Sequence, residues 1–236
     1  MRDRYNQANI PIRSAYFIEG KTSVCRIKFI AAILLAAACS FFTLPNALAM
    51  NFSVVTLRGE PAIIGQGEIV EGDAARLKAV LTLNAMNSYG YFALVLDSPG
   101  GSVLDAFEIA QVMDEYYVNT YIRPGDECVS ACAAIVFIAG REHVAVSGSY
   151  LGFHGCFNTR DLSINSMCNE VIAEHAVAHG TAYGAVMAFI ENIPATQVVW
   201  VSGDDADCWG INRYDISPEP PSYQQCIISI MQEMLQ

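Results

Sequence analysis

The sequence predicts an α/β fold built around a mostly parallel sheet. Residues 91–96, with the sequence YFALVL, are apolar without interruption, as strands buried on both faces of a parallel sheet are. Apolar residues at helical spacing follow over 103–117, and a short strand pattern comes next at 119–123. A strand, a helix and a strand in this order favour parallel pairing.

The other predicted elements continue this alternation along the chain. They are a strand at 62–70, a helix that starts at 71–73 and runs to about 83, an almost wholly apolar helix at 130–139, short strands at 143–146 and 150–154, one long helix at 170–192, a segment at 196–215 that closes the core, and a final amphipathic helix that contains Cys226. The polar segment 155–167 is expected to be a surface loop.

Residues 1–49 have the three parts of a secretory signal. A basic segment over 1–28 precedes an apolar run over 29–44, and the small-residue site Ala47-Leu48-Ala49 follows. The apolar run is about 16 residues, shorter than the roughly 20 that a membrane-spanning helix needs. We expect cleavage after Ala49 and export to the periplasm or the extracellular space, which leaves one domain over 50–236. If the segment stays uncleaved, it anchors the protein to the membrane; lipid attachment at Cys39 would require a better lipobox.

The charge balance of the expected mature protein excludes one class of partner. The chain has 13 Lys+Arg and 24 Asp+Glu, of which 6 and 2 lie in residues 1–49, so residues 50–236 have a formal charge of −15. That much negative charge repels nucleic acids and anionic lipid surfaces. We therefore expect no nucleic-acid partner.

Six cysteines lie in the mature part, and an even number in an exported chain indicates disulfides. Cys156 and Cys168 bracket the polar loop, so we predict a bond between them. Cys208 with Cys226 is a weaker candidate pair. Cys128 with Cys132 is compatible with disulfide geometry only if the turn before Ser130 is not helical. The C-x-x-C spacing of zinc ribbons and thioredoxins is absent.

Three short segments contain residue types that can together perform hydrolysis. They are DSPGGS at 97–102, ECVSAC at 127–132 and YLGFHG at 150–155. Each alone has an ordinary explanation, as a tight turn, a helix N-cap and a hydrogen-bonded histidine. Their order and spacing favour a catalytic interpretation instead, because a serine nucleophile needs both a base and donors for an oxyanion.

The combined pattern resembles the proteolytic subunit of the Clp protease, within the wider ClpP/crotonase fold, and is most similar to the exported ClpP-like proteins of bacteria. The matching segments are LDSPGGS at 96–102, CVSAC at 128–132, FIAG at 137–140 and LGFH at 151–154, with a weaker match at 200–202 and 206–211. The resemblance covers roughly residues 62–211. It implies a ClpP/crotonase-like β-α spiral with a mostly parallel sheet.

The resemblance also implies roles for individual residues. Ser130 aligns with the nucleophile, and His154, 24 residues later, with the general base. The backbone N–H groups of Gly101 and Ala131 align with the two donors of the oxyanion hole. The implied enzyme is a serine peptidase without cofactor or metal, it acts on a peptide or protein substrate, and it belongs to a family whose members form homo-oligomeric rings.

The sequence departs from the family at the third member of the triad. The register of the closing segment places the expected aspartate near Val198, which cannot accept a hydrogen bond from imidazole. The protein is then either a Ser–His dyad with another orienting acceptor, or a catalytically silent module of the same fold that binds peptides or assembles with partners.

Three further interpretations remain beside these two. A crotonase-type acyl-CoA enzyme shares the fold and the oxyanion hole, but export disfavours it. A cysteine hydrolase would use Cys128 or Cys132 with His154, and oxidation of these thiols disfavours it. His175 and His179 have a spacing that allows a shared metal ion, but without a third ligand nearby we interpret them as a solvated helix face.

Overall fold

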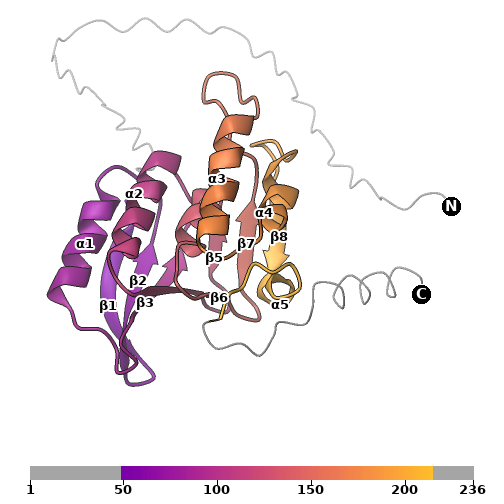
Figure 1. Cartoon of the computed structure of the whole chain (residues 1–236). Helices are drawn as coiled ribbons and strands as arrows, with labels where there is room; N and C mark the ends of the chain where they lie inside the picture. Colours follow the sequence, from indigo (N-terminus) through magenta and orange to yellow (C-terminus); the bar gives the residue numbers. More distant parts are fainter. Residues whose placement is uncertain (1–48, 215–236) are drawn as a thin grey trace, which may run out of the picture. The chain divides into compact units, whose positions relative to one another are not determined.

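The computed structural model describes residues 49–214, which contain a central sheet of five strands (Figure 1). The strand order is β1-β2-β3-β4-β6, with bounds β1 (Asn51–Leu57), β2 (Glu60–Gln66), β3 (Phe92–Asp97), β4 (Val118–Ile122) and β6 (His143–Ala145). β1 and β2 form an antiparallel hairpin, and every other neighbouring pair is parallel. The prediction of an α/β fold with a mostly parallel sheet is confirmed.

Two helices, α1 (Asp73–Leu83) and α2 (Val103–Asp114), lie side by side against this sheet (Figure 1). They bury residues at helical spacing, such as Leu77 and Ile109, against the alternate residues of β3 that include Leu94. Ser102 caps the N-terminus of α2, since its side chain accepts a hydrogen bond from the N–H of Asp105. The start of α2 is thereby fixed directly behind the Gly-Gly turn that follows β3.

A second, smaller sheet carries the other two segments of the candidate site. It contains β5 (Glu127–Val129), β7 (Tyr150–Phe153) and β8 (Val199–Ser202) in the order β5-β7-β8, with β5 parallel and β8 antiparallel to β7. The π-helix η1 (Cys132–Phe137) follows β5 and is buried along its whole length, because all its side chains are small or apolar. α5 (Gly203–Ala206) follows β8.

The long helix predicted for 170–192 is wrong, because the chain forms two helices there. α3 (Ser166–Ala178) ends before Gly180, which has a φ of 84°, and α4 (Tyr183–Ile190) begins after a short turn. A glycine in the left-handed conformation commonly ends a helix. Thr181 fixes the turn, since its side chain is buried and hydrogen-bonds to Nε2 of His143 at 3.0 Å.

The sequence patterns also missed three strands and placed one helix start wrongly. β1, β5 and β8 were not predicted as strands, and the helix expected to begin at Ser130 begins only after it. Residues 1–48 and 215–236 lie outside the described part of the chain, so nearly all of the predicted signal segment and the final helix lie outside it as well. Cys208 lies within the described part and is disulfide-bonded, but its predicted partner Cys226 lies outside. None of the helices within 49–214 is long and apolar enough to cross a membrane.

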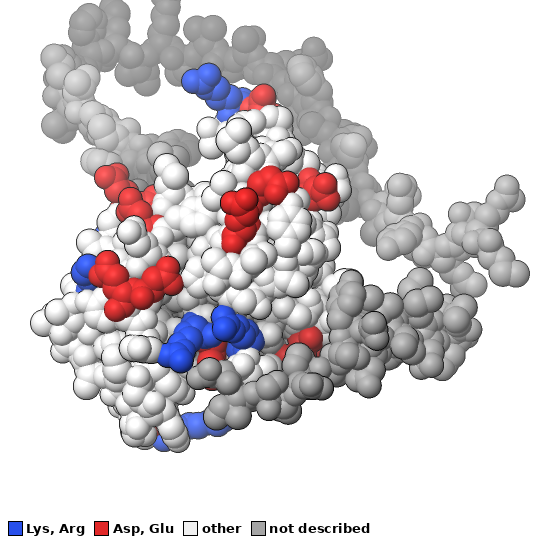
Figure 2. All heavy atoms as spheres, in the orientation of Figure 1, with Lys and Arg blue, Asp and Glu red and all other residues white. Residues whose placement is uncertain are grey.

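The surface of the described part has the negative balance that the composition predicts. Figure 2 shows acidic side chains in several separate groups on one face, and Lys and Arg in a few others. The absence of a nucleic-acid partner stays a prediction.

Candidate active site

The Gly-Gly turn after β3 forms one wall of the site. Gly101 has a φ of 147°, and a Cβ atom there would overlap the carbonyl oxygen of Ile69. Gly100 has a φ of 89°, and its Cβ would lie 2.9 Å from Cβ of Ser130. Both positions therefore require glycine, for their backbone conformation and for lack of space. The turn consequently packs directly against the turn that carries Ser130.

Ser130 lies at the end of β5 in a left-handed conformation, with a φ of 57°. This conformation costs an L-residue other than glycine about 1–2 kcal/mol, so the surroundings must hold it. The N–H of Ser130 donates to the carbonyl of Gly152 in β7 at 2.7 Å, and the N–H of Val129 donates to that of Ser98 at 2.9 Å. We expected Ser130 to be the first residue of a helix. It forms instead the corner between a strand and a helix.

A disulfide between Cys128 and Cys132 spans this corner. The Cα atoms of the two residues are 5.3 Å apart, which is possible because the chain between them is a turn. Both cysteines are completely buried. Neither provides a free thiolate, so the interpretation as a cysteine hydrolase that uses Cys128 or Cys132 is wrong.

His154 follows β7, and its imidazole has a definite tautomer. Nδ1 lies 2.9 Å from the carbonyl oxygen of Gly155. Because a carbonyl only accepts, Nδ1 carries the proton in the neutral ring, and Nε2 has the free lone pair that a general base needs. The tautomer is therefore the one required for removing a proton from Ser130.

The backbone of Gly155 is fixed by residues from a distant part of the chain. Its N–H donates to the carbonyl of Ile193 at 2.7 Å. A Cβ at this position would lie 2.6 Å from the carbonyl oxygen of Ile190 and 2.9 Å from that of Ile193. The carbonyl that orients His154 thus has little freedom to move. The sequence analysis did not single out Gly155, and the only available signal was a glycine directly after the histidine.

Val198 stands where the family resemblance places the triad carboxylate. In the antiparallel ladder Val199 is opposite Phe153, so Val198 comes next to His154. Its side chain packs over Gly152, where an added Cβ would lie 3.0 Å from Cγ1 of Val198. The orienting acceptor is therefore the carbonyl of Gly155 and not a carboxylate on β8.

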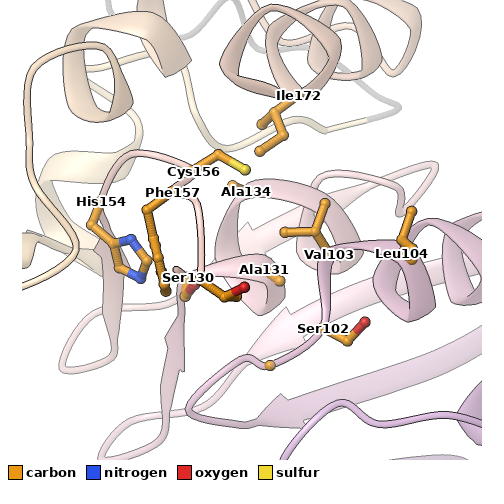
Figure 3. A pocket seen from close by; sticks show the side chains of 12 residues that line it. Ser102, Val103, Leu104, Ser130, Ala131, Ala134, His154, Cys156, Phe157 and Ile172 are labelled. Atoms are coloured by element: carbon orange, nitrogen blue, oxygen red, sulfur yellow. The ribbon is translucent and has the colours of Figure 1, made fainter. Parts of the chain in front are cut away.

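These segments meet at one cavity of about 350 Å³ (Figure 3). All four sequence-predicted site residues line it. The side chains around them come from α2, η1, α3 and the loop after β7, and apart from His154 none of them is ionisable. The complete lining is Gly101, Ser102, Val103, Leu104, Ser130, Ala131, Ala134, His154, Cys156, Phe157, Thr159 and Ile172.

The polar groups expected to act in catalysis have no competing partners. Among residues 49–214, the hydroxyl of Ser130 makes no hydrogen bond, and the N–H groups of Gly101 and Ala131 donate to no protein acceptor. Ser130 and His154 both border the cavity, but no hydrogen bond joins their side chains. A long nucleophile–base contact is common before substrate binds.

The predicted disulfide between Cys156 and Cys168 is present, with Cα atoms 5.9 Å apart. It ties the loop after His154 to the first turn of α3. Cys156 itself lines the cavity, and Phe157 packs near His154 with ring centroids 5.8 Å apart. The disulfide between Cys156 and Cys168 thus fixes the loop that forms one side of the cavity.

His175 and His179 do not form the solvated helix face that we expected. Nε2 of His175 donates to the carbonyl of Ile135 in η1 at 3.1 Å, and His179 contacts Asp114 at 3.0 Å. Burial, and then the neighbouring charge of His179, lowers the pKa of His175 to about 4. Within the described residues no three His, Cys, Asp or Glu side chains are grouped as metal ligands.

Comparison of the sequence with models of known protein families and with curated proteins gave no significant match. The resemblance to Clp-type hydrolases consequently depends on the motifs themselves and on the chemistry that their residues can perform.

Proposed function

We propose that the protein is an exported serine hydrolase of the ClpP/crotonase superfamily that cleaves peptide bonds, or related amides or esters. The observation that carries this proposal is the 2.9 Å contact of Nδ1 of His154 with the carbonyl of Gly155, which leaves Nε2 as the acceptor nitrogen in the neutral ring, at the cavity that Ser130 also lines. Export is supported by the signal-like N-terminus and by two disulfides, which persist in oxidising compartments.

The proposed mechanism begins with transfer of the Ser130 proton to Nε2 of His154 as the serine oxygen attacks the substrate carbonyl. The N–H groups of Gly101 and Ala131 stabilise the oxyanion, and each such donor typically contributes about 3–4 kcal/mol to the transition state. His154 then gives its proton to the leaving amine. A water molecule, activated by the same imidazole, hydrolyses the acyl-Ser130 intermediate.

A carbonyl in place of a carboxylate retains only part of a triad's function. It holds the ring in the correct tautomer and orientation, as the aspartate does. It supplies no negative charge to stabilise the imidazolium that forms during attack. We therefore expect a slow Ser–His dyad that is nevertheless well above the activity of a hydrolase with the wrong tautomer.

The cavity selects substrates by their apolar character. Its side chains from α2 and α3 are Val103, Leu104 and Ile172, and the loop adds Phe157. A charged substrate side chain would lose its hydration there without gaining a partner. Peptides with an uncharged, apolar residue on the acyl side of the scissile bond are the expected substrates.

The decisive experiment is covalent labelling with a fluorophosphonate, followed by peptide mapping and by assays on peptides with different acyl-side residues. Ser130 should be labelled, and Ser130→Ala should abolish both labelling and turnover. Ser166→Ala is the matched control, because Ser166 is an exposed serine at the start of α3. Labelling of Ser166 in place of Ser130, or equal turnover by wild type and Ser130→Ala, would contradict the proposal.

A second candidate function is a silent module of the same fold that binds peptides in the cavity. The observations that favour it are the valine at the carboxylate position and the absence of a hydrogen bond between Ser130 and His154. In this case the peptides should bind without being cleaved, and the fluorophosphonate should leave Ser130 unmodified.

A further inference from the structure

The disulfide between Cys128 and Cys132 closes a short loop around Ser130. Of the two disulfides in the described residues, it closes the smaller loop. The two cysteines are only four positions apart, compared with 12 for Cys156 and Cys168. Ser130 is the middle residue of this loop. A constraint that short acts on the backbone conformation of the nucleophile itself.

The conformation of Ser130 needs such a constraint because the local sequence favours another one. Residues 130–139 have the apolar pattern of a helix that begins at Ser130, but the residue adopts a φ of 57°. Of the described non-glycine residues only Arg58, Ser130 and Leu162 have a positive φ, and only Ser130 lines the cavity. A right-handed conformation would remove its N–H from the carbonyl of Gly152 and redirect its hydroxyl.

The disulfide is the one covalent link, besides the chain itself, between the strand before Ser130 and the helix after it in the described structure. Cys128 lies in β5, where it is paired with Leu151, and Cys132 begins η1. Both are completely buried among apolar side chains, so their bond is shielded from solvent thiols in the folded protein. Without the bond, the start of η1 is free to extend backwards through Ser130.

We propose that Cys128 and Cys132 are positioning residues for Ser130, and that the hydrolase is fully active only when these two thiols are oxidised. This inference depends on the proposed function. Oxidation removes two protons and two electrons from the thiols. They pass to the disulfide of an oxidant, either a protein or a small-molecule disulfide, which is released as two thiols. A chain in a reducing compartment is then a latent enzyme, and disulfide formation after export completes its nucleophile.

The first test is a double-mutant cycle with Cys128→Ala, Cys132→Ala and the double variant in the full chain. Each should react with a fluorophosphonate about fivefold to thirtyfold more slowly than wild type, the ratio expected if Ser130 relaxes from its left-handed conformation. The three rates should be equal, because either substitution removes the same bond. The kcat for peptides should fall while KM, which reports on the apolar cavity, stays unchanged.

These readouts distinguish positioning from general stabilisation. All rates are measured well below the unfolding temperature of each variant, where loss of stability alone would not change them. Additive effects of the two single substitutions would indicate lost packing and would overturn the inference. So would wild-type rates in the double variant. If wild type itself is not labelled at Ser130, the proposed function fails first.

A second measurement needs only the wild-type chain and applies even if the variants do not fold. The tryptic fragment that ends at Arg141 contains Ser130 together with Cys128 and Cys132 and no other cysteine. Protein sampled during reoxidation is treated with the fluorophosphonate, its free thiols are alkylated, and this fragment is analysed by mass spectrometry. Phosphonylated Ser130 should occur predominantly on fragments that carry the disulfide. Phosphonylated fragments in which both cysteines are alkylated, at the frequency of the unlabelled ones, would refute the inference.

Discussion

Replacement of Gly155 by alanine tests the carbonyl that orients His154. Gly155 has no positive φ, so alanine meets no conformational penalty there, and the change acts through space alone. The new Cβ would lie 2.6 Å from the carbonyl oxygen of Ile190 and 2.9 Å from that of Ile193. Ordinary carbon–oxygen contact is longer, by something on the order of 0.5–1 Å. The Gly155 peptide must therefore move by a similar distance.

A movement of that size is enough to break the hydrogen bond to His154. The bond measures 2.9 Å now, and a side-chain contact of 3.6 Å or more is no longer a hydrogen bond. The ring would then lose its fixed tautomer and orientation. Displacements of about 1 Å in catalytic geometry cost roughly 100-fold, and a wrong tautomer in a triad costs about 10⁴. We expect kcat/KM of Gly155→Ala to fall by about 10²–10³.

Gly184→Ala is the matched control. Gly184 lies in α4, and a Cβ there would meet no atom within 4 Å, so alanine should leave kcat/KM unchanged and stabilise the fold by about 0.4–1 kcal/mol. The assays are peptide turnover, thermal unfolding and ¹⁵N NMR of the histidine ring, which reads the tautomer without reference to activity. A folded Gly155→Ala protein with wild-type turnover and a pure Nδ1–H tautomer would refute the role given to this carbonyl.

Three other predictions concern an oxyanion donor, position 198 and the buried histidines. Gly101→Ala should lower kcat by about 10²–10³ with KM little changed, because the backbone at position 101 must shift and one oxyanion donor is lost. Steady-state kinetics on a peptide measure this effect. Val198→Asp should move the acid limb of the kcat/KM pH profile to higher pH, because a carboxylate beside His154 favours the imidazolium form of the base. An unchanged limb would mean that position 198 does not face the ring. Burial lowers the pKa values of His143 and His175 to about 4, so the unfolded chain binds more protons between pH 4 and 6.5. Urea unfolding should therefore show full stability above pH 6.5 and progressive loss as the pH falls toward 4, whereas His143→Gln should weaken that dependence.

Much of the framework could be read from the sequence because it depends on short-range patterns. The apolar run that became β3, the helical spacing of α1 and α2 and the Gly-Gly turn are each visible within a dozen residues. The disulfide between Cys156 and Cys168 was predictable from two cysteines around a polar loop. The break between α3 and α4 was missed because apolar spacing continues through it, and only Gly180 signals the turn.

The sequence by itself determined which residues are available for chemistry, and the tertiary structure decided how they are presented. Ser130 looked like the start of a helix, and only its bonds to β7 and the disulfide around it hold it in the left-handed corner. The valine at position 198 indicated that His154 lacks a carboxylate partner, but the sequence did not show which group accepts its hydrogen bond instead. The replacement is the carbonyl of Gly155, which is fixed by backbone atoms of Ile190 and Ile193. Those residues are far away in the chain, so a contact of this kind leaves no local pattern in the sequence and arises only when the fold brings the segments together.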